Sequence, residues 1–177
     1  IIGDLDGDAT IVATKAQSVD VFVWKVTNGV VNPTPQKYAF PVATPSYYWN
    51  VVPMPVGMTG YMGFFSTSAT NGLIWMNSTM GEVSRSSGVR TSGGDVITIN
   101  GRVYVAYTAY SGDQKGVMRI CDITDGKYNQ IFNYTMEASG ANGNSTASAC
   151  VMVKNNELYA VFGCTGSGLY FYRIACK

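Results

Sequence analysis

The 177-residue sequence contains no histidine, and only 13% of its residues are charged. Without an imidazole, catalysis by a nucleophile–histidine pair is excluded, and so is a zinc site completed by histidine. The net charge is +1, with no cluster of Lys or Arg. Nucleic-acid binding needs a basic stripe that displaces counterions, so we expect no nucleic-acid partner. No stretch approaches the roughly 18 apolar residues of a transmembrane segment, and we expect none.

Residues that favour helices, such as Ala, Leu, Glu, Lys and Arg, are sparse, whereas Tyr, Val, Thr and Phe are plentiful. The plentiful types suit a pleated, half-buried surface, so the composition predicts an all-β protein. Low charge with abundant Gly, Ser, Thr, Asn and Tyr is typical of an exported β protein. The length suits a single domain over residues 1–177.

A four-stranded meander is predicted between Asp95 and Asn133. Its apolar runs are separated by Asn100-Gly101 and Asp125-Gly126, and such pairs favour the tight turns of β-hairpins. The same succession of apolar run, polar turn and apolar run recurs along the chain. We therefore expect four repeats, at approximately 1–31, 45–85, 93–135 and 146–177.

The third strands of these repeats give a common register, because they begin at Asp20, Gly72, Gly116 and Gly168. Subtracting neighbouring positions gives intervals of 52, 44 and 52 residues, close to the roughly 40–50 residues of a propeller blade. Central runs such as VYVAYTAY are apolar at nearly every position, as in strands covered on both faces. The sequence thus predicts about four antiparallel β-meander, blade-like repeats that form a β-propeller or part of one. A β-sandwich is the alternative.

Polar and proline-rich segments are expected to connect the repeats. Loops are predicted over 86–94 and 138–148, and the proline-rich segment 30–55 is predicted to be an extended connection. The first repeat is expected to begin at a second strand and the last to lack a fourth. The ends could therefore complete one shared blade, belong to a larger ring of which this chain is a fragment, or be completed by a second chain.

Four cysteines, Cys121, Cys150, Cys164 and Cys176, lie within apolar strand patterns. One interpretation is four small hydrophobic residues inside strands, since unpaired cysteine is among the most buried residue types. The other is two disulfides formed in an oxidising compartment.

The acidic motif near the start of the chain places carboxylates at Asp4, Asp6 and Asp8, separated by single residues. Alternating carboxylates with a glycine at the bend can wrap calcium, which takes about six to eight oxygen ligands. No acidic residue follows at the closing position. The motif is therefore either a calcium loop or a tight acidic turn that leads into a strand.

The consecutive aromatic residues Tyr47, Tyr48 and Trp49 are the predicted ligand-binding residues. Three neighbours in sequence cannot all face one core, and an exposed ring can stack on a sugar or contact a protein. The acidic residues from Asp113 to Glu157 fall mostly at turns or strand edges and single out no pair. The sequence therefore assigns no catalytic residue.

The segments GDLDGDATIVATKA with VFVWKVTNG, and GDVITINGRVYVAYTAY with ICDITDG, carry a resemblance to a known group. They resemble uncharacterised propeller-like domains in surface lipoproteins of gut Bacteroidota. The resemblance covers most of the chain. It implies a secreted or outer-membrane location and an association with glycan capture, and it brings no defined functional residues.

We therefore expect an extracytoplasmic binding module for a glycan or a protein partner. Two alternatives remain. The chain could be part of a carbohydrate-active hydrolase or lyase whose catalytic carboxylates lie elsewhere in the ring, or a structural module of a larger surface assembly.

Overall fold

The computed structural model describes residues 2–3, 5–15, 18–42, 49–55, 57–65, 72–86, 90–110, 116–135, 149–164 and 168–174. Within these ranges the chain forms sixteen β-strands and no helix. Every strand pairing is antiparallel.

The strands form four sheets in chain order. Sheet 1 contains β1 (Ile2–Gly3), β2 (Ala9–Thr14), β3 (Asp20–Thr27), β4 (Val30–Val31) and β5 (Gln36–Ala39). Sheet 2 contains β6 (Trp49–Pro53), β7 (Tyr61–Phe65), β8 (Leu73–Met76) and β9 (Glu82–Ser86). Sheet 3 contains β10 (Arg90–Ile99), β11 (Arg102–Tyr110), β12 (Gly116–Asp122) and β13 (Asn129–Thr135). Sheet 4 contains β14 (Ala149–Lys154), β15 (Glu157–Cys164) and β16 (Gly168–Ile174).

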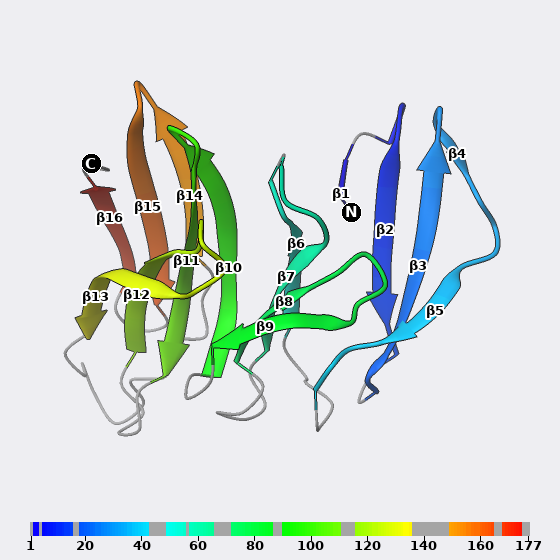
Figure 1. Ribbon diagram of the computed structural model, residues 1–177, viewed down its shortest axis with the longest axis horizontal. Coiled ribbons are helices and arrows are strands. Elements are labelled where there is room, and N and C mark those ends of the chain that lie inside the picture. Colours follow the sequence, from blue (N-terminus) through cyan, green and yellow to red (C-terminus); the bar gives the residue numbers. More distant parts are fainter. Residues whose placement is uncertain are drawn as a thin grey trace.

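The predicted fold class is confirmed, because the chain is all-β and each sheet is an antiparallel meander of the blade-like kind. The predicted third strands are also found: β3, β8, β12 and β16 each occupy the third place in their sheet. Figure 1 shows the sheets following one another across the molecule, from blue β1–β5 to orange and red β14–β16.

Three sequence expectations are corrected. A short strand, β1, does precede the second strand of the first repeat and pairs with it. The proline-rich segment 30–55 contributes β4, β5 and β6; Pro53 is tolerated because β6 is the first strand of its sheet and has one unpaired edge. Strand β10 begins at Arg90, inside the predicted loop, because buried Gly93 and Gly94 let the strand run close to its neighbours.

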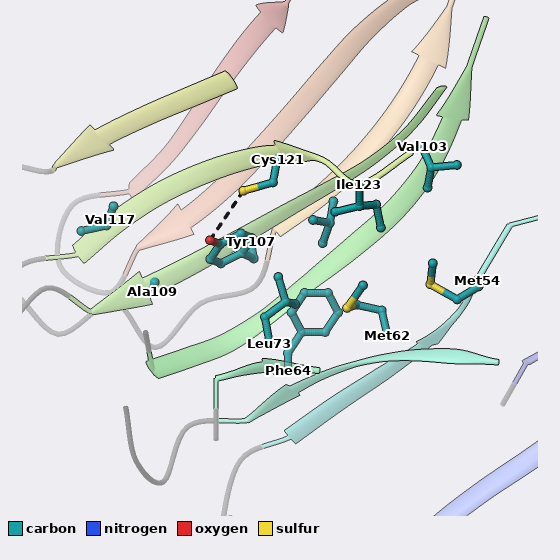
Figure 2. Packing of buried hydrophobic residues seen from close by; sticks show 11 residues of the cluster. Met54, Met62, Phe64, Leu73, Val103, Tyr107, Ala109, Val117, Cys121 and Ile123 are labelled. Atoms are coloured by element: carbon teal, nitrogen blue, oxygen red, sulfur yellow. Dashed lines mark hydrogen bonds between the residues drawn. The ribbon is translucent and has the colours of Figure 1, made fainter. Parts of the chain in front are cut away.

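An apolar cluster lies between each pair of successive sheets. Val21 and Val23 of sheet 1 meet Phe65 and Ile74 of sheet 2. The next cluster joins sheets 2 and 3, and Figure 2 shows Met62, Phe64 and Leu73 pointing towards Tyr107 and its neighbours. The last joins sheets 3 and 4 through residues that include Tyr104, Ala106, Met118, Leu158 and Phe162. Each fully buried large apolar side chain contributes about 1.5–3 kcal/mol, so the stack is held together chiefly by contacts between sheets.

Strand β11 shows why the central strands are apolar at nearly every position. Successive side chains of a strand point to opposite faces. Val103, Val105 and Tyr107 therefore pack towards sheet 2, while Tyr104 and Ala106 pack towards sheet 4. A sheet between two others needs apolar residues on both faces, and the sequence of β11 meets that requirement.

Tight turns join the first two strands of sheets 3 and 4. Asn100 and Gly101 have φ values of 51° and 75°, and Asn155 and Asn156 have values of 53° and 59°. Positive φ at both central residues is what a type I′ hairpin requires. The Asn155-Asn156 turn shows that asparagine can hold both positions in this fold.

Substitution of Gly94 tests the close approach of β10 to its neighbours. A Cβ at this position would collide with the Phe64 ring and the Ala106 carbonyl oxygen. We expect Gly94→Ala to lower the free energy of unfolding by about 2 kcal/mol or more, measured by urea denaturation. The matched control is Gly101→Asn, which has open space around it and recreates the Asn-Asn turn of sheet 4. Equal stability of the two variants would contradict the packing described for β10.

Candidate functional site

The acidic motif lies against the turn between β3 and β4. The backbone N–H of Asn28 donates to Asp8 Oδ1 at 3.1 Å, and the N–H of Gly29 donates to the Gly7 carbonyl at 2.8 Å. Asp6 and Asp8 are exposed, whereas Asp4 lies outside the described residues. The Asp8 carboxylate therefore has a structural role, because it anchors the loop to the neighbouring turn.

An open hollow of about 420 Å³ lies beside this loop. Among its lining residues, Lys25 Nζ donates to Thr10 Oγ1 at 2.9 Å between the paired strands β3 and β2. The hollow is lined by Ile2, Gly3, Asp8, Ala9, Thr10, Lys25, Val26 and Thr27. In the part of the chain that the structure describes, no three Asp, Glu or Cys side chains gather as a metal-binding group. The calcium loop of Asp4, Asp6 and Asp8 stays a prediction.

Of the predicted aromatic residues, Trp49 is described and Tyr47 and Tyr48 lie outside the described residues. Trp49 begins β6 and is half-buried. Its ring centroid is 5.4 Å from that of Phe40, beside the cluster between sheets 1 and 2. This contact gives Trp49 a packing role, and ligand binding by the three aromatic residues stays a prediction.

Several carboxylates of the described residues take part in ion pairs. The pairs join Asp20 to Lys37, Glu82 to Arg85, Asp122 to Arg102 and Glu157 to Arg173. They come from different sheets, and each carboxylate is neutralised by a cation of its own sheet. Three of these pairs link two strands, and the Glu82–Arg85 pair lies within β9. The arrangement presents no pair of carboxyl groups around a common substrate.

Asp122 is the most buried of these carboxylates, with 5% of its side chain exposed. Thr124 donates its hydroxyl at 2.6 Å and its N–H at 3.0 Å, and Arg102 Nε donates at 2.7 Å. Burial by itself raises the pKa of Asp122, but the bonds from Thr124 and Arg102 outweigh burial and hold that pKa below its ordinary value. Asp122 therefore stabilises the turn after β12 as a carboxylate.

The two cysteines with described side chains, Cys121 and Cys150, are unpaired. Cys121 is buried, and its Sγ lies 3.8 Å from the Tyr107 hydroxyl (Figure 2). Burial raises the pKa of the Cys121 thiol and that of the Tyr107 phenol, so neither group supplies an anion for catalysis. Cys121 fits the small-hydrophobe interpretation, whereas Cys150 is exposed. The Cys164 side chain and Cys176 lie outside the described part of the chain.

The outer face of sheet 4 carries a set of exposed apolar residues that the sequence did not single out. Phe171 is 72% exposed, Leu169 67% and Met152 51%. Val161 of the middle strand, β15, pairs with Phe171 of β16 and with Cys150 of β14. Tyr159 of the same strand pairs with Arg173 of β16 and with Met152 of β14. These two residues therefore lie between the exposed residues of the outer strands. Directly paired residues share one face of a sheet. These residues therefore form one surface opposite the core, called here the sheet 4 outer face.

The outer face of sheet 1 is also apolar but is more covered, because Phe22 and Trp24 are half-buried and Val26 is buried. Phe22 and Trp24 project from β3 with ring centroids 6.3 Å apart, and Ile11 pairs with Trp24. Val31, which pairs with Val26 on the same face, is 44% exposed. This surface is called the sheet 1 outer face, and it leaves an apolar surface at each end of the stack.

The sequence contained a signal for the sheet 4 outer face. In β16, GLYFYRI, the aromatic side chains of Tyr170 and Tyr172 pack towards sheet 3, while Leu169 and Phe171 alternate with them on the other side. A strand that is apolar at successive positions is expected to be covered on both faces. The sequence could not show that the described chain covers only one face of β16, the face that points towards sheet 3.

The described residues include no helix long and apolar enough to cross a membrane.

No protein-family model matches the chain, and no curated protein matches it in sequence. Among solved structures, the crystal structure of a DUF4623 family protein from Bacteroides eggerthii DSM 20697 has a similar fold, with a TM-score of 0.66 and 17% sequence identity. The similarity covers 98% of this chain and 44% of the other, so this chain spans less than half of that protein's length. This structural neighbour comes from the bacterial group named by the sequence resemblance, and at this identity the likeness shows the fold alone.

Substitution of Asp8 separates its turn contact from metal binding. Asp8→Ala removes the acceptor for the Asn28 N–H, so we expect it to cost about 1 kcal/mol of stability. Asp8→Asn keeps a side-chain oxygen and is expected to stay close to the parent protein. The melting temperatures of the parent, Asp8→Asn and Asp8→Ala should follow the same order with EDTA as with added calcium. A parent melting temperature that rises with calcium, with no rise in Asp8→Asn, would support the calcium loop instead.

The depressed pKa of Asp122 gives a pH-dependent stability. A carboxyl whose pKa is lower in the folded state stabilises the fold above the ordinary value of about 4, and that contribution is lost as pH falls through the folded-state pKa. Asp122→Asn should therefore cost about 1–3 kcal/mol near neutral pH. Its deficit relative to the parent should shrink as the pH falls below the ordinary value of about 4 and through the lower folded-state pKa of Asp122. Urea unfolding near neutral pH and at the lower pH measures this, with Glu82→Gln of a more exposed ion pair as the milder control. A deficit independent of pH would contradict this role.

Proposed function

We propose that this chain is a binding module, built as part of a β-propeller, and that it binds a protein partner through the sheet 4 outer face. The observation that carries the proposal is the exposure of Leu169 and Phe171, 67% and 72%, on a strand whose other face is packed in the core. Contiguous exposed apolar surfaces are rare on soluble monomeric proteins, and they commonly mark sites of protein contact.

The chemistry of the face favours a protein over a glycan. Aliphatic and thioether groups from Met152, Val161 and Leu169 make up much of it. Three of its polar groups are already bonded to one another: Arg173 pairs with Glu157 at 3.0 Å, and Tyr159 Oη donates to Glu157 at 2.7 Å. A sugar site needs polar groups that can turn to the sugar hydroxyls, whereas the centre of a protein interface is apolar with few charges.

A binding role also agrees with the carboxylates of the described residues. Asp20, Glu82, Asp122 and Glu157 are each engaged by a cation, which supports structural roles for them. The hydrolase or lyase alternative would have to draw its catalytic carboxylates from elsewhere, and no contact described above favours it.

We place this module outside the cytoplasm, in a secreted or surface-anchored protein of the Bacteroidota type. The low charge of the chain, 13%, and the sequence resemblance to surface lipoproteins support that setting. The fold similarity to a Bacteroides eggerthii protein is in keeping with it.

A photoreactive residue on the sheet 4 outer face tests the proposed function. We expect Leu169→p-benzoylphenylalanine to form a discrete crosslinked polypeptide in the cell-envelope fraction of the host, because this exposed side chain is part of the apolar surface. Adding Phe171→Asp should remove the product, since loss of a central interface residue weakens binding by about tenfold or more. The matched control places the same photoreactive residue at Val83 of β9, which is also exposed but lies between the ends of the stack.

The alternatives give different results. Equal crosslinking from positions 169 and 83 would contradict a specific face. A glycan-array signal that depends on Phe171, with no crosslinked polypeptide, would replace the protein partner by a glycan.

A further inference from the structure

We draw no further inference here: the strongest candidate, the open hollow of sheet 1 beside the acidic loop, carries none because its Lys25 and Asp8 side chains are already engaged by the Thr10 hydroxyl and the Asn28 backbone, and nothing among the described residues shows what would occupy it.

Discussion

Strand β11 must be covered on both sides, and the arrangement of the other strands depends on that requirement. Val105 and Tyr107 face sheet 2, while Tyr104 and Ala106 face sheet 4. A sheet with two apolar faces leaves a large surface in water unless another sheet lies on each of them. Stacking in chain order meets this demand with short connections, since each meander places the next one beside it. The close passage of β10 at Gly94 is part of the same constraint, because it lets Phe64 reach the backbone of sheet 3.

The same requirement explains where the described chain leaves apolar faces uncovered. Sheets 2 and 3 are packed against another sheet on both faces, whereas sheets 1 and 4 are packed against another sheet of the described chain on one face each. Phe171, with 72% of its surface exposed, has the apolar chemistry of the residues buried between sheets without their burial. The proposed binding of a protein at this face would use the same interaction that holds the stack together. In this molecule the folding interface and the proposed binding interface have one physical basis, the burial of apolar faces of successive sheets.

The fold was largely predictable because its signals are local. Asn100-Gly101 fixes a hairpin through positive φ, and the unbroken apolar run of β11 indicates burial on both faces. The limits of β10 were not predictable, since its Gly-Gly pair signals a loop until the Phe64 ring from another sheet is in place. The sheet 4 outer face, where we propose binding, was missed for a related reason. Leu169 and Phe171 read as core residues, and whether a core position is covered depends on which sheets are present. The acidic and aromatic motifs were easier to notice, but Asp8 contacts a turn and Trp49 contacts Phe40.

The exposure of Cys150 can be compared with the interpretation of the cysteines that we drew from the sequence. The interpretation of the cysteines as small buried hydrophobic residues holds for Cys121, which lies between sheets 2 and 3. Cys150 has the same strand context but is exposed, because its side chain lies on the sheet 4 outer face opposite Val161. A further sheet on this face would bury Cys150 as Cys121 is buried, and would bring it into line with the usual burial of unpaired cysteine. The exposure of Cys150 thus agrees with that of Phe171 in marking a surface whose chemistry suits contact with another sheet.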